Sequence, residues 1–184
     1  MITKKTWEML SQKQAGLGEL IIKNNPSGLQ WVSRFNAKRL KLCLLVEIGE
    51  LANEIKSFKA WRKKPEIDWD KVKEELIDCL CFFLDLSNLF QVELTDFSFP
   101  AEKQELHFNK LLLKLFAQTN DLSILEKEEL YKLGKTKITN QKSYQEWLKT
   151  FQILGAKLAI SEQELLTIYL RKNEKNQVRA TEKE

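Results

Sequence analysis

The segment from residue 69 to residue 91 is the feature that most constrains the fold. It contains LIDCLCFFLDLSNLF, which is apolar on nearly every side of a helix. Such a helix lies at the centre of its domain, with other helices around it. Apolar residues also recur at helical spacing in 6–23 and 36–59, and Pro26 and Pro65 interrupt the pattern after each segment. Because six glycines and three prolines leave little material for the tight turns of a sandwich or barrel, the sequence predicts an all-α helical bundle.

The second half of the chain is expected to be helical as well, after a connection at 92–104. Three S-x-x-E sequences each precede a helical apolar pattern and can cap the orphan amides of a helix start. They pair Ser123 with Glu126, Ser143 with Glu146, and Ser161 with Glu164. Asp68 or Asp70 is expected to cap the helix that starts near residue 69. The last helix begins at Ser161 and ends in a polar tail that is expected to be partly loose.

The composition indicates one domain in a protein of a reducing compartment. A chain of 184 residues can bury a sizeable core. Its net charge of +4 comes from 30 basic and 26 acidic residues spread along the chain, whereas a binder of polymeric nucleic acid usually has a concentrated basic stripe. Three cysteines without framework spacing argue against a disulfide scaffold. With neither a signal peptide nor a run of about 18 apolar residues, we expect a cytoplasmic protein without a membrane partner.

Several short motifs suggest chemistry that their context does not support. Gly134-Lys135-Thr136 ends a P-loop signature whose earlier glycine is missing, and Gly16-Leu17-Gly18 is a dinucleotide-binding fragment without a preceding strand. Cys79 and Cys81 would point about 200° apart on a helix. His107 is the only histidine in the chain. Zinc sites and histidine-based triads are therefore poor interpretations.

Carboxylates interrupt the two most apolar helices at helical spacing. Glu47 and Glu50 are three residues apart and share a helix face. In the next helix Glu75 and Asp78 repeat this spacing, and Asp85 falls near the same line. Two such helices are expected to pack against each other, so that their acidic faces converge.

Buried like charges need a partner. Burying these carboxylates without compensation would cost many kcal/mol, and a divalent cation removes the conflict. Oxygen ligands suit Mg²⁺, or Mn²⁺ in its place, and Mg²⁺ also recruits substrate phosphates. A Glu-x-x-Glu pair is more often a solvated helix face, so spacing alone leaves a metal site and a solvated face both open.

Three segments resemble the dimeric all-α dUTPase family, a branch of the helical nucleoside-triphosphate pyrophosphatases. The family pattern is Glu-x-x-Glu, Asn-Glu and Phe-Lys-x-Trp, then Glu-x-x-Asp, and a C-terminal Tyr-x-x-Lys-Asn-x-x-Asn-x-x-Arg. The chain matches it in LLVEIGELANEIKSFKAW (44–61), EELIDCLCFFLDLSN (74–88) and YLRKNEKNQVR (169–179). The paired acidic motifs are shared by the whole superfamily, whereas Phe-Lys-x-Trp and the tail motif are specific to the dUTPase branch.

The resemblance implies an Mg²⁺-dependent homodimer that hydrolyses dUTP, and also dUDP, to dUMP. The fold would be a bundle of the all-α pyrophosphatase type, with the metal site between its two central helices. The ligands would be Glu47, Glu50, Glu75 and Asp78, and Glu47 would also orient or deprotonate the attacking water. Bound cations would neutralise the charge that develops on the phosphate oxygens and on the pyrophosphate leaving group.

The resemblance also implies a division of the chain. Residues 1–168 would form a single catalytic domain, of which 92–160 is the less recognisable part. Residues 169–184 would be a mobile motif that closes over the substrate.

Substrate contacts follow from the same motifs. The family's tail cations bind phosphate, its asparagines line the nucleotide pocket, and a glutamine of the first helix recognises the base. The matching residues here are Gln14, Lys59, Trp61, Asn88, Lys172, Asn176 and Arg179. Structural explanations stay open beside these roles: Trp61 could be a core aromatic, Gln14 a surface residue, and Lys172 part of a solvated helix end.

The chain departs from the family near the expected base and sugar pocket. Cys81 stands where the family often has histidine, Leu17 replaces a polar residue, and Gly18 replaces an acidic one. A cysteine cannot match imidazole as a hydrogen-bonding partner. These departures put the selectivity for uracil in doubt more than hydrolysis, and use of dCTP becomes conceivable.

Two other functions remain open on sequence grounds. A MazG-type pyrophosphatase of broader specificity would share the metal motifs without needing the tail motif. A helical adaptor without catalytic activity would use the charged tail to bind a partner.

Overall fold

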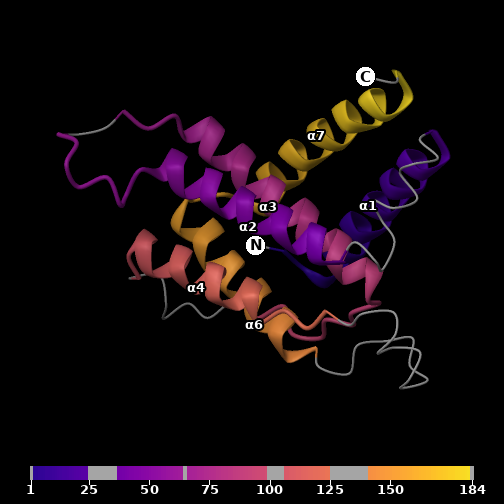
Figure 1. The fold of residues 1–184 in the computed structure, drawn as a ribbon, viewed down its shortest axis with the longest axis horizontal. Coiled ribbons are helices and arrows are strands. Elements are labelled where there is room, and N and C mark those ends of the chain that lie inside the picture. Colours follow the sequence, from indigo (N-terminus) through magenta and orange to yellow (C-terminus); the bar gives the residue numbers. More distant parts are fainter. Residues whose placement is uncertain (1, 25–36, 64–65, 99–105, 125–140, 183–184) are drawn as a thin grey trace.

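The structure is a computed structural model that describes residues 2–24, 37–63, 66–98, 106–124 and 141–182. Within these ranges every regular element is a helix and no strand occurs, as predicted. The helices are α1 (Lys4–Asn24), α2 (Ala37–Ile55), α3 (Trp69–Leu89), α4 (Phe108–Asn120), α6 (Lys142–Lys157) and α7 (Glu162–Glu182) (Figure 1). None of these described helices is long and apolar enough to cross a membrane.

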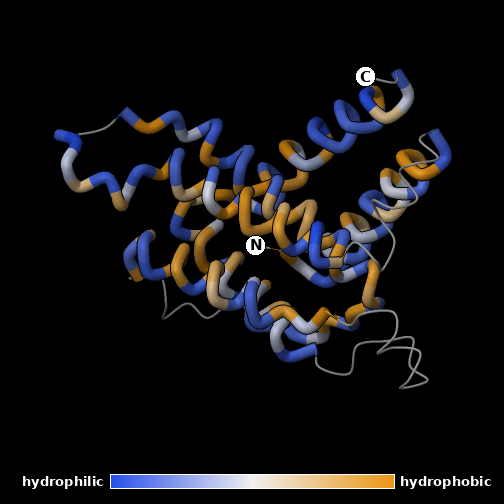
Figure 2. The backbone as a smooth tube through the Cα atoms, in the orientation of Figure 1, coloured by the Kyte–Doolittle hydropathy of each residue, from blue (hydrophilic) through white to orange (hydrophobic). Residues whose placement is uncertain are grey.

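Helices α2 and α3 form the centre of the bundle. They make the most extensive helix–helix contact, and α3 also contacts α1 and α7. Two outer pairs pack around them, α1 with α7 and α4 with α6, and α4 lies against α2 (Figure 1). Apolar segments meet in the middle of the molecule, whereas the outer end of α7 is hydrophilic (Figure 2). The prediction that the apolar helix after residue 69 is central is confirmed, because its buried residues lie on several sides.

Aromatic stacking holds α6 against α3. The rings of Phe83 and Trp147 stack with centroids 4.0 Å apart, and Phe151 stacks on Trp147 at 5.4 Å. The indole Nε1 of Trp147, which is fully buried, donates to Thr119 Oγ1 at 2.9 Å. Every polar atom of this indole therefore has a partner, as a buried tryptophan requires.

Two predicted caps are present and two helix ends differ from expectation. Asp68 accepts from the backbone N–H of Lys71 at 3.2 Å, and Ser161 Oγ accepts from that of Glu164 at 3.1 Å. Helix α2 ends at Ile55 rather than near residue 59, because Lys56 adopts a left-handed φ of 59°. The Phe-Lys-x-Trp segment therefore lies in a turn region after the helix.

The capping box predicted at Ser143 is wrong. Helix α6 begins two residues earlier, with Gln141 at the cap position, so Ser143 lies inside the first turn and its Oγ has no hydrogen-bond partner. For the box at Ser123, the partner and the segment that follows lie outside the described residues, as does the P-loop fragment at 134–136. Helix α4 was not predicted as a separate element.

The tail is not loose in the part that is described. Helix α7 continues without a break from Glu162 to Glu182, across the boundary expected at residue 169. Tyr169 is fully buried, and its hydroxyl donates to the backbone oxygen of Leu10 at 3.2 Å. The start of the tail motif is thus part of the core, and contact with α1 explains why it is helical despite its polar sequence.

Candidate active site

Three carboxylates from the two central helices converge on one point. Glu47 of α2 and Glu75 and Asp78 of α3 each offer an oxygen, and these atoms lie within 4.8 Å of one another. We call these residues the carboxylate cluster. The prediction that the acidic faces of the two helices meet is confirmed for these three residues.

The helix pattern explains this convergence. Glu47 directly precedes the fully buried Ile48, and Glu75 and Asp78 flank a fully buried pair in α3. Each carboxylate therefore lies at the edge of an apolar stripe, where the seam between α2 and α3 meets solvent. All three are partly buried, which the interpretation as a solvated helix face does not account for.

The carboxylates make it costly for one another to ionise. Burial raises the pKa of Glu47 to about 7, and the negative charges of Asp78, Glu50 and Glu75 add to the shift. The pKa values of Glu75 and Asp78 are raised as well, in both cases chiefly by burial. Their own positions therefore disfavour a fully ionised cluster.

Glu50 lies near the cluster without joining its closest group. It is exposed, one helical turn beyond Glu47. Its negative charge contributes to the raised pKa values of Glu47, Glu75 and Asp78. Of the four predicted ligands, three are thus brought together and the fourth stands at the solvent edge.

Lys172 of the tail motif reaches the cluster from α7. Its Nζ forms an ion pair with Asp78 Oδ2 at 2.5 Å and donates to the backbone oxygen of Glu74 at 3.3 Å. Its charge lowers the pKa values of Glu47, Glu75 and Asp78, although burial outweighs it. With its side chain only 18% exposed, Lys172 lies against the carboxylate cluster and is not a solvated helix end.

The cluster suits a divalent cation. Its donors are carboxylate oxygens at mutual distances that one ion can bridge. A single ammonium group faces three acids, and their pKa values remain raised in its presence. Hard oxygen donors fit Mg²⁺ or Mn²⁺ better than softer metals. Glu47, Glu75 and Asp78 would hold such an ion, with Glu50 one turn away.

The residues of the Phe-Lys-x-Trp segment lie apart from the cluster. Trp61 is 72% exposed and packs edge-on against Phe58 with centroids 6.2 Å apart, so it is not a core aromatic. Lys59 Nζ donates to Asn53 Oδ1 at 2.5 Å. These side chains stand in solvent next to the end of α2.

Two further predicted residues lie along α7. Asn176 is partly buried and Arg179 is exposed. Arg179 stands seven residues beyond Lys172 on the same helix, about 10 Å along its axis. Within the described part of the chain, no contact joins either residue to the carboxylate cluster.

Gln14 and Asn88 join α1 to its neighbours. Gln14 is only 5% exposed, so it is not a surface glutamine, and its Oε1 accepts from the hydroxyl of Tyr169 at 3.0 Å. Asn88 Nδ2 donates to the backbone oxygen of Ser11 at 2.9 Å, and its Oδ1 accepts from the Ser11 hydroxyl. The polar amide of Asn88 in so apolar a helix thus has partners for both of its polar atoms.

Asp85 is a polar residue whose importance the sequence only hinted at. It was noted on the acidic line of α3 but was not named as a site residue. Burial raises its pKa to about 7, and a hydrogen bond from the side chain of Gln14 opposes this shift. A carboxyl group in the most apolar helix was the available signal.

The three departures from the family pattern lie near this region. Cys81 stands between Asp78 and Asp85 on α3, and the charges of both raise the pKa of its thiol, after burial. Leu17 and Gly18 are buried on α1. All three are therefore in the interior or at its edge, where a change of side chain alters the packing around a ligand.

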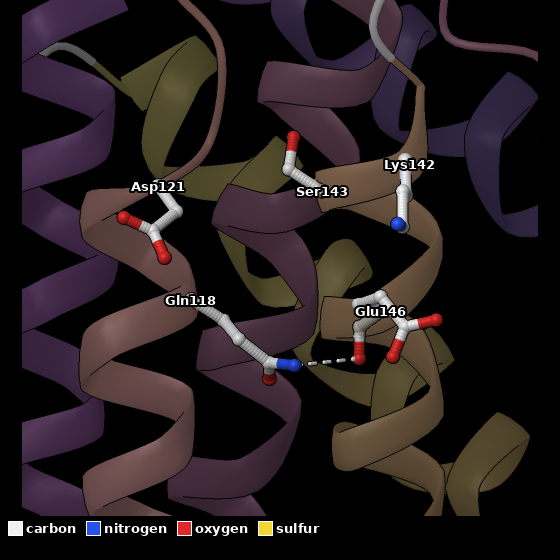
Figure 3. A pocket seen from close by; sticks show the side chains of 5 residues that line it. All are labelled: Gln118, Asp121, Lys142, Ser143 and Glu146. Carbon is white, nitrogen blue, oxygen red and sulfur yellow. Dashed lines mark hydrogen bonds between the residues drawn. The ribbon is translucent and has the colours of Figure 1, made fainter.

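Two pockets share no residue with the carboxylate cluster. One, of about 330 Å³, lies between α4 and α6 and is lined by Gln118, Asp121, Lys142, Ser143 and Glu146 (Figure 3). The other, of about 420 Å³, is an apolar groove between α2 and α4. Neither contains the concentration of acids that distinguishes the cluster.

Comparison with known proteins agrees with this geometry. A family model described as dUTPase matches residues 6–183, which is almost the whole chain. No curated protein gives a match to the sequence. The matched region contains both central helices, the carboxylate cluster and the tail motif. The chain therefore belongs to the dUTPase family, and its activity is that of a dUTP diphosphatase.

Proposed function

We propose that the protein hydrolyses dUTP, and also dUDP, to dUMP in an Mg²⁺-dependent reaction at the carboxylate cluster. The observation that carries the proposal is the meeting of Glu47, Glu75 and Asp78 within 4.8 Å of one another. Such a cluster has no stabilising role of its own, because burial raises the pKa of each member. The cytoplasm is the expected location.

The residues of the site have distinct roles in the proposed reaction. The three carboxylates and Glu50 hold the cation, which when bound neutralises charge on the phosphate oxygens and the leaving group. Glu47, whose pKa burial raises to about 7, orients the attacking water and accepts its proton. The apolar residues beside the cluster keep the carboxylates in place before substrate arrives.

Lys172 couples the tail to the cluster. Its ammonium group lies on Asp78 at 2.5 Å, and a substrate phosphate would attract it more strongly than the acids would if these held a cation. Lys172 would then turn to the phosphates, with Arg179 approaching from the end of the same helix. Movement toward the substrate of the part of α7 that follows the buried Tyr169 would complete the site.

This role of the tail favours a dUTPase over a MazG-type pyrophosphatase. The latter needs only the paired acidic motifs, so it gives no reason for a tail lysine to touch a metal ligand. The contact between Lys172 and Asp78 is the observation that separates them. Asn176 and Asn88 would line the nucleotide pocket and Gln14 its base end, while Lys59 and Trp61 would approach from the turn after α2.

We also propose that the enzyme is a homodimer. Leu42 and Val46 stand exposed on α2, 60% and 49%, and Leu113 of α4 is 69% exposed. The apolar groove between these helices adds Phe58 and Phe116 to the same face. Exposed apolar surface of this extent is typical of an association surface, and a second copy is its proposed occupant.

The direct test measures pyrophosphate release from dUTP, dCTP, dTTP and dATP, and phosphate release from dUDP, with Mg²⁺ and then with EDTA. Cleavage restricted to the uracil nucleotides and abolished by EDTA is expected. Glu47→Gln should lose at least about a hundredfold in kcat, as removal of a general base does, while Glu174→Gln on the exposed side of α7 should match the parent. Cleavage that persists in EDTA would contradict the proposal, and equal cleavage of all four triphosphates would favour the broader pyrophosphatase. Sedimentation of the parent and of Leu113→Glu tests the dimer.

A further inference from the structure

A second polar cluster lies beyond the carboxylates, between α1, α3 and α7. It consists of Gln14, Asp85, Tyr169 and Asn173, and we call it the Asp85 cluster. Gln14, Tyr169 and Asn173 are 5%, 0% and 5% exposed, and Asp85 is partly exposed. Four polar side chains gathered in so apolar a bundle need an explanation.

Hydrogen bonds orient three members of the cluster. The Tyr169 hydroxyl donates to Gln14 Oε1 at 3.0 Å. This leaves the amide nitrogen of Gln14 as the group that donates to the Asp85 carboxyl. Tyr169 therefore fixes Gln14, and Gln14 fixes Asp85. A carboxylate can accept about four hydrogen bonds, so Asp85 retains acceptor capacity that this arrangement does not use.

Asn173 supplies the complementary group. Its Oδ1 accepts from Gln177 Nε2 at 2.7 Å. Its Nδ2 is buried and makes no hydrogen bond of regular geometry within the described part of the chain, although it lies close enough to the Tyr169 hydroxyl to lower the pKa of that group. A buried amide nitrogen without a partner costs about 1–3 kcal/mol. Such a donor is typical of a site that a ligand completes.

The position of the cluster matches one end of the substrate. Asp85 lies seven residues after Asp78 on α3, so two helical turns, about 10 Å, separate them along one face. Lys172 and Asn173 are adjacent on α7, so the same helix spans both clusters. A deoxynucleoside triphosphate with its phosphates at the carboxylate cluster is long enough to place its base at Asp85. This step rests on the proposed function.

We propose that Asp85 determines base specificity by accepting a hydrogen bond from the N3–H of the uracil ring, while the amide nitrogen of Asn173 donates to a ring carbonyl beside it. Uracil presents one donor between two acceptors, and an acceptor next to a donor on the protein matches that edge. A carboxylate at this place repels phosphate, so the other end of the substrate fits it poorly. The flat base also suits an apolar surround with a few polar groups.

The experiment compares dUTP with N3-methyl-dUTP, which lacks the N3–H donor, in the full-length protein with Mg²⁺. For the parent, kcat/KM should fall about 10- to 100-fold on methylation, the range for a hydrogen bond to a charged group. For Asp85→Ala, which also makes room for the methyl group, the ratio between the two substrates should shrink at least about tenfold. Most of the change should lie in KM, since the contact is remote from the reacting phosphates.

Asp85→Asn is the second variant, because it keeps the size and the bond to Gln14 and should fold as the parent does. It should lose dUTP efficiency, while its melting temperature and its Mn²⁺ affinity stay at the parent values. If both Asp85 variants lose equal factors on the two substrates, Asp85 only supports Gln14, and the proposal is overturned. Failure of the parent to cleave dUTP would instead refute the proposed function, so the two failures are distinguishable.

Discussion

Two regions of this molecule are built from similar apolar helices but differ in how their buried polar and charged groups are compensated. Where α4 and α6 pack on the centre, the indole Nε1 of Trp147 donates to Thr119 Oγ1 at 2.9 Å and its ring stacks with Phe83 and Phe151. Where α2 meets α3, Glu47, Glu75 and Asp78 converge with raised pKa values. The indole of Trp147 has its hydrogen-bond partner within the protein, although Ser143 Oγ and Gln118 Oε1 of the same helix pair have none. The carboxylates of the second region are offset only in part, by Lys172.

The difference separates parts that stabilise the fold from parts that bind. A satisfied buried group contributes to stability, whereas an unsatisfied one costs free energy and persists only for another reason. The carboxylate cluster between α2 and α3 and the buried amide nitrogen of Asn173 on α7 are of the second kind. Changes in the first region should therefore alter stability, and changes in the second should alter activity.

The largest expected effect on stability is at Trp147. Trp147→Ala removes a fully buried ring stacked between Phe83 and Phe151, which should lower the free energy of unfolding by about 3–5 kcal/mol. Denaturant titration measures this loss, and Lys110→Ala at an exposed site of α4 is the control. Activity per folded molecule should stay near that of the parent. A stable Trp147→Ala protein without activity would break the comparison.

A smaller effect, on activity alone, is expected at Lys172. Lys172→Ala removes the ammonium group on Asp78, so kcat/KM for dUTP should fall about 10- to 100-fold, or about 1.4–2.7 kcal/mol. Steady-state kinetics measures the fall, and Lys175→Ala, exposed on the same helix, should stay within about twofold. With Mg²⁺ present to compensate the acids, the melting temperature should change little. Equal losses in both variants would show that only the net charge of the tail matters.

The pH dependence of stability in metal-free protein sharpens the comparison further. The pKa of Glu47 rises from 4.5 to about 7 on folding, so between these values the folded state holds more protons than the unfolded state. Stability then falls as the pH rises from about 4.5 to 7. We expect Glu47 to contribute about 1–2 kcal/mol to this fall, allowing for partial exposure.

Unfolding at several pH values in EDTA measures that slope. Glu47→Gln cannot ionise and should flatten it, while saturating Mg²⁺ should oppose the fall by binding the ionised cluster. Stability that rises over this interval in the parent, relative to Glu47→Gln, would contradict the account.

The smallest expected effect is on the free energy of unfolding, at the two serines Ser161 and Ser143 that share the S-x-x-E motif. Ser161 caps α7 through Glu164, so Ser161→Ala should cost about 1 kcal/mol. Ser143 has no partner for its Oγ, so Ser143→Ala should be nearly neutral or slightly stabilising. Chemical unfolding of both variants measures the difference, and a larger cost at Ser143 would mean that its hydroxyl serves the adjoining pocket.

The sequence predicted the central helices well because their signals are local. Apolar spacing set α2 and α3, and Asp68 and Ser161 are caps that act within a few residues. The cap predicted at Ser143 was wrong because the S-x-x-E motif there is the same as at Ser161, but the helix starts before Ser143. The polar tail was expected to be loose because its helical state depends on the burial of Tyr169 against α1, a tertiary contact that leaves no local pattern.

Prediction of the candidate active site from the sequence was limited in the same way, because contacts between distant residues leave no local pattern. Spacing placed Glu47, Glu75 and Asp78 on converging faces, but it could not distinguish them from Glu50, which the turn of α2 leaves exposed. The contact between Lys172 and Asp78 joins positions 94 residues apart, so only the fold reveals it. The sequence alone did not indicate a role for Asp85, because that role depends on Gln14 and Tyr169, which only the fold brings beside it.

The measurement that tests the central claim most directly is calorimetric titration of nucleotide-free protein with Mn²⁺. The parent should bind the ion, and Glu47→Gln and Asp78→Asn should each weaken binding by about tenfold or more, because each removes a charged ligand. Glu174→Gln should bind as the parent does. Undiminished binding in Glu47→Gln and Asp78→Asn, or no binding by the parent, would contradict the claim that these carboxylates converge to hold a metal ion.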